Sequence, residues 1–143
     1  MTWLNGSVNL IRPYCWGEDM NKKVNIIVSQ PPYGKEDAYS AIPMAAVQAS
    51  VSNEPSLIYV SGGVHSVVAG QKTSYGDLAV WLKDVPPIEA EIKKNLEIVK
   101  FYALDIDLEK RGISDEEIIP GIAKISLDEL TDKIIEGDVT LVF

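Results

Sequence analysis

A chain of 143 residues can bury one hydrophobic core but is too short for two good ones, so a single domain is expected. Its 21 acidic and 13 basic residues leave a formal net charge of −8, which would repel both a nucleic-acid backbone and an anionic membrane surface. No apolar run approaches the ~20 residues of a membrane span, and a cytoplasmic protein is expected.

Cysteine and histidine are scarce in the sequence. Cys15 is the only cysteine, so no internal disulfide can form, and His65 is the only histidine. These two side chains cannot supply the Cys/His ligand set of a structural zinc site, so no metal is expected.

Residues 1–21 are expected to form an N-terminal arm or extension, separate from a domain over residues 22–143. Trp3, Tyr14 and Trp16 lie here among turn-forming residues. Large aromatic side chains are costly to leave in water. Two interpretations therefore stay open: a disordered tail, or an arm that packs on its own or a neighbouring subunit.

The first strand is predicted over residues 24–29, where a near-continuous β-branched run is typical of a strand covered on both faces. It leads into a loop that contains Pro31, Pro32 and Gly34. Residues 40–51 are then predicted as a helix. With Ser40 as its N-cap, Pro43 would fall in the first turn, where its missing N–H has no helical partner anyway.

Residues 57–61 form the second predicted strand, and residues 64–69 a short helical turn closed by Gly70. The irregular stretch 71–87 is predicted as a loop with a brief helix near residues 78–82. A further helix is predicted from residue 87 onward because apolar residues recur at the helical period. These residues are Ile88, Ile92, Leu96 and Val99.

The last third of the chain carries three predicted strands and two helix starts. A strand is predicted over residues 101–106 and a helical turn over residues 108–111, with Asp105 and Asp107 as a solvated pair at its start. Capping boxes at Ser114–Glu117 and Ser126–Glu129 mark the two helix starts. The remaining strands are predicted over residues 122–125 and 139–143.

Strands that alternate with helices in this way predict an α/β fold with a mostly parallel sheet of about five strands and helices on both faces. The strand over residues 24–29 is expected to be central, and residues 139–143 are expected to form the last strand.

Ligands usually bind at the carboxyl ends of parallel strands, and two strand ends here are rich in glycine. The candidate pocket consists of Tyr33, Gly34, Gly62, Gly63, His65 and Gln71. Backbone N–H groups of the glycines could bind an anion, and the imidazole could donate to it or act as an acid or base. A structural role for His65 is the alternative. The glycine spacing is neither a P-loop nor a dinucleotide fingerprint, so no cofactor is expected.

Four segments of the chain carry a resemblance to known proteins: Ser29–Gly34, Gly63–Gln71, Arg111–Ile113 and Asp138–Phe143. Together they resemble the DsrE/DsrF family of sulfur-relay proteins, and most closely its DsrF/TusC branch. The resemblance extends from about Lys22 to Phe143. It implies a flavodoxin-like domain that assembles into trimers or hexamers, either homo-oligomers or mixed complexes with related subunits. It also implies intracellular sulfur trafficking through a cysteine persulfide, with a sulfur-carrier protein as a possible partner.

The resemblance places the cysteine of the sulfur-accepting subunits at about Leu104, counted back from Gly112, and this chain has no thiol there. A binding or scaffold subunit is therefore the preferred interpretation. One alternative is a sulfurtransferase that uses Cys15, so whether the protein is an enzyme stays open. Another is a small-ligand or nucleotide-binding domain whose glycine loops surround His65.

Overall fold

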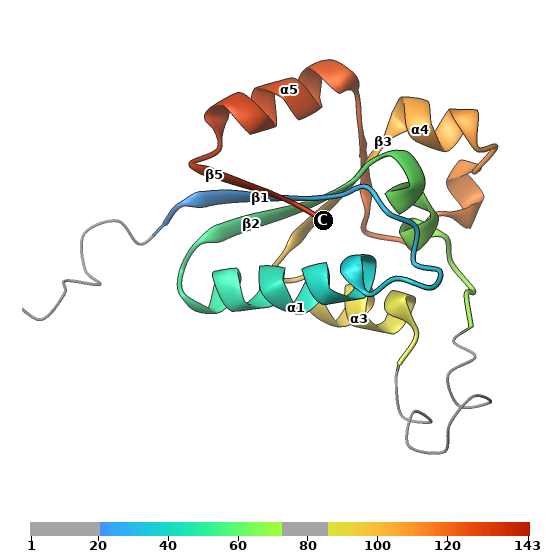
Figure 1. Cartoon of the computed structure of the whole chain (residues 1–143), viewed down its shortest axis with the longest axis horizontal. Helices are drawn as coiled ribbons and strands as arrows, with labels where there is room; N and C mark the ends of the chain where they lie inside the picture. The colour runs from blue at the N-terminus through green and yellow to red at the C-terminus, as the bar shows by residue number, and fades with distance from the viewer. Residues whose placement is uncertain (1–20, 73–85) are drawn as a thin grey trace, which may run out of the picture.

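A five-stranded parallel sheet forms the centre of the computed structural model, which describes residues 21–72 and 86–143 (Figure 1). The strands lie in the order β4-β3-β2-β1-β5, and every neighbouring pair is parallel. Their bounds are β1 Lys23–Val28, β2 Glu54–Tyr59, β3 Lys100–Leu104, β4 Ala123–Ile125 and β5 Val139–Val142. The predicted α/β class with a parallel sheet is confirmed.

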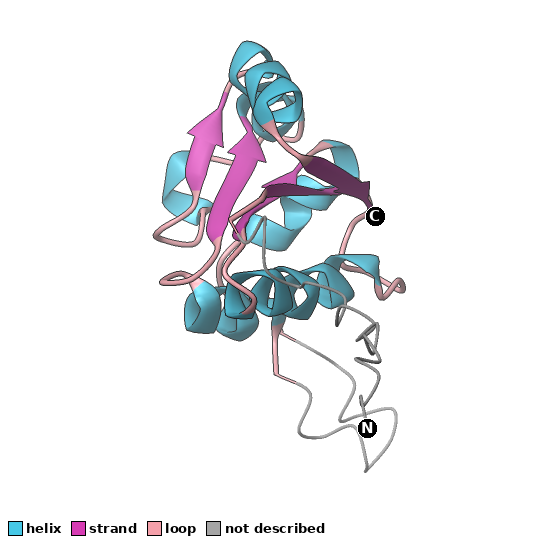
Figure 2. Ribbon diagram, turned by 90° about the vertical axis from the view of Figure 1, so that its left-hand side faces the viewer, coloured by secondary structure: helices cyan, strands magenta, loops and turns pink. Residues whose placement is uncertain are grey.

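Helices cover both faces of the sheet (Figure 2). One face packs on α1 (Asp37–Ser50) and α3 (Ile88–Asn95), and the other lies under α5 (Leu127–Glu136), with α4 (Asp105–Lys110) near its end (Figure 1). Two 3₁₀ segments, η1 (Ser61–Val67) and η3 (Asp115–Glu117), complete the described elements. The predicted arm up to residue 20, with Cys15, and the predicted helix near residues 78–82 lie outside the described residues.

The main core fills the space between the sheet and the layer of α1 and α3. Alternate residues of β1 and β2 point into it, so Ile26, Val28, Leu57 and Tyr59 are fully buried. A smaller cluster lies on the other face, under α5. Its buried members are Ile58, Leu104, Ile125 and Leu130.

The middle strand is β2 rather than β1. Both β1 and β3 pair with β2, and β5 then adds to the free edge of β1. The chain therefore reverses its direction across the sheet between β4 and β5. Because parallel crossovers are right-handed, this reversal places α5 on the face opposite α1. Residues 24–29 were predicted to form the central strand, and the structure shows them in the interior strand next to it.

Helix α1 begins earlier than predicted, at Asp37 with Glu36 as its N-cap residue, so Ser40 is not the cap. Pro43 consequently lies inside the helix. The helix accommodates it because Pro43 faces solvent, where the Tyr39 carbonyl that loses its N–H partner can be hydrated.

The two predicted helix starts, at Ser114 and Ser126, open elements of different kinds. Both capping boxes form, with Ser126 N–H donating to the Glu129 carboxylate at 2.7 Å and Ser114 N–H to that of Glu117 at 2.9 Å. Only the box at Ser126 begins an α-helix, because the box at Ser114 begins the short 3₁₀ segment η3. The third strand also ends earlier than predicted, at Leu104, because the acidic residues after it favour the first turn of α4.

Within the described residues, every helix is too short or too polar to cross a membrane.

Segment η1 packs directly on the carboxyl end of β1. The Gly63 N–H donates to the Ser29 carbonyl at 3.1 Å, and a Cβ at residue 63 would overlap the carbonyl of Val28. At Gly62 a Cβ would meet the Pro31 ring at 2.9 Å. Only glycine therefore permits this approach of one backbone to another.

Replacing Gly63 by alanine should lower the free energy of unfolding by about 1–3 kcal/mol, because β1 and η1 would have to separate. Denaturant unfolding of the full chain measures this loss. Ser66→Ala is a matched control in the same segment, since its buried hydroxyl has no hydrogen-bond partner among the described residues and its loss should cost no stability. Equal stability of Gly63→Ala and wild type would contradict the packing argument.

Candidate functional site

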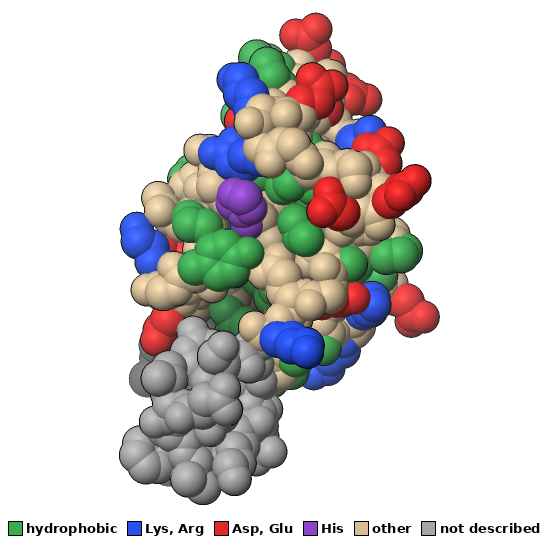
Figure 3. Space-filling view, turned by 90° about the vertical axis from the view of Figure 1, so that its right-hand side faces the viewer, with side chains coloured by type: hydrophobic (Ala, Val, Ile, Leu, Met, Phe, Trp, Pro, Cys, Tyr) green, Lys and Arg blue, Asp and Glu red, His purple; other side chains and the backbone are tan. Residues whose placement is uncertain are grey.

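The rim at the carboxyl ends of β1 and β2 brings together two of the predicted site residues. The rings of Tyr33 and His65 lie 6.2 Å apart between centroids and are tilted by 50°. Tyr33 is 60% exposed and His65 is partly exposed. Figure 3, which views this end of the molecule, shows the single histidine beside a group of apolar side chains. This pair offers an aromatic and a titratable group to a partner or ligand.

The predicted site glycines act through the backbone. Gly62 and Gly63 permit the close approach of η1 to β1, and the Gly63 N–H is already bonded to the carbonyls of Ser29 and Val60. Gly34 takes a positive φ of 69° in the loop after β1, with open space around it. The backbone geometry therefore accounts for glycine at these positions without a bound anion.

Gln71 closes the end of η1 and does not extend the rim. Its side-chain amide donates to the carbonyls of His65 and Val68, the latter at 3.1 Å. The neighbouring Gly70 N–H donates to the Glu89 carboxylate of α3 at 2.6 Å. Gln71 therefore helps to fix the backbone that carries His65.

Glu89 connects this part of the rim to α3. Its carboxylate also accepts from the Lys93 ammonium at 2.6 Å. The Lys93 hydrogen bond, and then the Gly70 N–H, hold the pKa of Glu89 below its ordinary value. The ionised form of Glu89 thus stabilises the end of η1.

Asp107 fixes the start of η1, a role that sequence reasoning missed. Its carboxylate accepts the Ser61 N–H at 2.6 Å and lies 3.6 Å from the Arg111 guanidinium. Ser61 has a left-handed φ of 48°, which is uncommon for a residue with a side chain. Asp107 was predicted to be solvated beside Asp105. The i, i+4 spacing to Arg111 was the available signal, but nothing in the sequence links either residue to Ser61.

Leu104 is the last residue of β3 and lies in the small cluster under α5. It is 5% exposed and packs with Ile58, Ile125 and Leu130. The position at which the sequence resemblance places a cysteine is therefore a buried apolar site.

In residues 21–72 and 86–143, no three His, Cys, Asp or Glu side chains are grouped so that they could hold a metal ion.

Comparison with known proteins gives the family. The model of the DsrE/DsrF-like family matches residues 22–143. The chain belongs to this family. No curated protein matches it. Neither the family match nor the fold distinguishes the DsrF/TusC branch, which stays a prediction.

Two solved structures are similar to this DsrE/DsrF-like protein in fold. The YchN protein from E. coli has a TM-score of 0.73 at 22% sequence identity, over 85% of this chain and 99% of that one. MTH1491 from Methanobacterium thermoautotrophicum, described as a protein of unknown function, has a TM-score of 0.65 at 13% identity, over 86% and 100% of the two chains. The flavodoxin-like α/β fold is thus confirmed.

The ion pair of Glu89 predicts a pH-dependent contribution to stability. Because its folded-state pKa lies below the ordinary value of 4.5, Glu89 stabilises the fold above that pH, and this stabilisation is lost as the pH falls through the folded-state pKa. Glu89→Gln should therefore lower the free energy of unfolding at pH 7 and have a smaller effect at pH 3.

Chemical denaturation at both pH values measures the difference. Glu97→Gln, which removes an exposed carboxylate just after α3, is the matched control. An equal effect of Glu89→Gln at the two pH values would contradict the assignment.

Proposed function

We propose that this DsrE/DsrF-like protein is a cytoplasmic subunit of an intracellular sulfur-relay or sulfur-trafficking assembly, and that it acts by binding and not by accepting sulfur on its folded domain. The buried Leu104 is the observation that supports this proposal most directly. A sulfur carrier needs an exposed thiolate, because the thiolate is the attacking nucleophile. Residues 22–143 contain no cysteine at all.

The rim supports a binding role. Tyr33 is largely exposed, and its ring lies next to that of His65. The chain around His65, which includes η1, is attached to β1 through Gly63, to α4 through Asp107 and to α3 through Glu89. A rigid surface with an exposed aromatic side chain is well suited to recognise another protein, since little freedom is lost on binding. A sulfur-carrier protein or a related subunit is the partner that this proposal implies.

The competing proposal is a sulfurtransferase that uses Cys15. In that reaction the outer sulfur of a persulfide donor would be transferred to the Cys15 thiolate, and the donor would leave as a thiol. Cys15 lies outside the described residues, so a measurement of sulfur uptake is needed to decide between the two proposals.

Treatment of the purified full chain with a low-molecular-weight persulfide should leave its intact mass unchanged. The folded domain has no thiol to accept sulfur, so any gain of mass would have to be on Cys15. Mass spectrometry of wild type and of Cys15→Ser, with a small thiol as a positive control for the donor, makes the comparison. A gain of one sulfur atom in wild type that is absent from Cys15→Ser would overturn the binding proposal in favour of the sulfurtransferase.

We also propose that the protein assembles into a trimer or hexamer, alone or with related subunits. Several large apolar side chains of α5 and β5 stay in contact with water in the single chain, with Ile135 75% and Val142 69% exposed. Covering such side chains at a subunit interface is favourable. Ile134 and Val139 belong to the same two elements and are also exposed.

Light scattering should therefore give three or six times the 15.7 kDa of one chain. Ile135→Glu should lower this mass, because burying an unpaired charge at an interface is costly. Lys94→Glu, on the exposed side of α3, is the control and should leave the mass unchanged. A wild-type monomer at micromolar concentration would contradict assembly of the chain with itself.

A further inference from the structure

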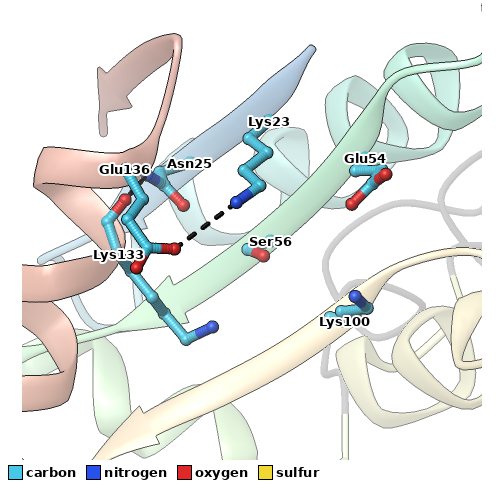
Figure 4. Close-up of a pocket in the computed structure, with 7 residues that line it drawn as sticks. All are labelled: Lys23, Asn25, Glu54, Ser56, Lys100, Lys133 and Glu136. Carbon is cyan, nitrogen blue, oxygen red and sulfur yellow. Dashed lines mark hydrogen bonds and ion pairs between the residues drawn. The ribbon is translucent and has the colours of Figure 1, made fainter. Parts of the chain in front are cut away.

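A polar hollow lies at the amino ends of the central strands, at the end of the sheet opposite the rim (Figure 4). Its volume is about 140 Å³. Three lysines, two glutamates and two neutral polar residues line it. They are Lys23 and Asn25 of β1, Glu54 and Ser56 of β2, Lys100 of β3, and Lys133 and Glu136 of α5.

The strand register places these side chains on one face of the sheet. Asn25 pairs with Ser56, and Ser56 pairs with Lys100, so the three lie in one row across β1, β2 and β3. Lys23 and Glu54 pair with each other two residues before Asn25 and Ser56, so their side chains lie on the same face of the sheet. The small apolar cluster under α5 lies nearer the carboxyl ends of the strands, which leaves the polar row open.

Lys133 is held over the hollow by a buried amide. Asn25 is only 4% exposed, and its side-chain N–H donates to the Lys133 carbonyl at 2.6 Å. Gly137 makes this contact possible, because a Cβ there would overlap the Asn25 amide. The Lys133 ammonium also lies 4.0 Å from the centre of the Tyr102 ring, which restricts it further.

The other two lysines are available to a ligand. Lys23 lies 3.4 Å from the Glu136 carboxylate, but both side chains are more than half exposed, so this ion pair is weak and easily exchanged. Lys100 is exposed and forms no ion pair within the described part of the chain. In Figure 4 the three ammonium groups surround the side chain of Ser56.

We propose that this hollow binds a small oxyanion, of the size and charge of sulfate or phosphate. Three lysines from three different elements can each donate to its oxygens, and the Ser56 hydroxyl can add a fourth hydrogen bond. The surplus of lysine over glutamate here contrasts with the charge of −8 on the whole chain. Glu54 and Glu136, which also line the hollow, would repel a larger polyanion, which limits the ligand to a single anionic group.

The proposal is tested by titrating the full-length, ¹⁵N-labelled protein with sodium phosphate, and separately with sodium sulfate, against sodium chloride of equal ionic strength. The expected result is a saturable shift of the Asn25 side-chain amide and the Ser56 backbone amide with the oxyanions and not with chloride. Glycerol phosphate forms a further arm: binding equal to that of phosphate indicates the phosphate group of an organic ligand, and much weaker binding indicates a free anion.

Lys100→Gln should weaken this binding on the order of tenfold, the loss expected for one hydrogen bond to a charged group. Since Lys100 is exposed, the variant should fold as the wild type does, which its spectrum verifies directly. Lys94→Gln, on the opposite face of the sheet, is the matched control and should bind as wild type does. Two results would overturn the proposal: equal amide shifts with chloride and with the oxyanions, or oxyanion binding that Lys100→Gln leaves unchanged. This inference does not depend on the proposed sulfur-relay role.

Discussion

The pairing of β1 with β2 over a fully buried apolar face is the constraint on which the rest of the structure depends. Ile26 and Leu57 pair in register and are both completely buried against the layer of α1 and α3. A shift of one residue would turn this apolar face to the other side of the sheet, at a cost of several buried side chains. The register is therefore fixed, and it sets which side chains stand at each end of the sheet.

The two ends of the sheet have different chemistry as a result. At the carboxyl end, the 3₁₀ segment η1 is attached at its start by Asp107, in its middle by the backbone contact of Gly63, and at its end by Glu89. That rim carries an aromatic and an imidazole group. At the amino end, the same register lines up a row of polar side chains that runs from the buried Asn25 to the exposed Lys100, with Lys133 of α5 beside it.

The position of Leu104 connects the fold to the proposed role. The last residue of β3 points into the apolar cluster under α5, so this site contributes to stability and offers no nucleophile. The described residues form three other surface features: the rim at one end, the hollow at the other, and the exposed apolar side chains of α5 and β5. A binding subunit of a larger assembly is consistent with all three.

Local patterns in the sequence determined the elements, their order and the parallel sheet, because β-branched runs, helical periodicity and capping boxes act over a few residues. They also indicated that Tyr33 and His65 lie on one rim, since both come after strands that end at one edge. The start of α1 was missed because Pro43 alone does not tell whether its face is solvated. Tertiary structure alone decided three features: the contact of Asp107 with Ser61, the hydrogen bond from Asn25 to the Lys133 carbonyl, and the row from Asn25 to Lys100. Each joins residues far apart in the chain, and their distance depends on strand order and register, which no short pattern contains.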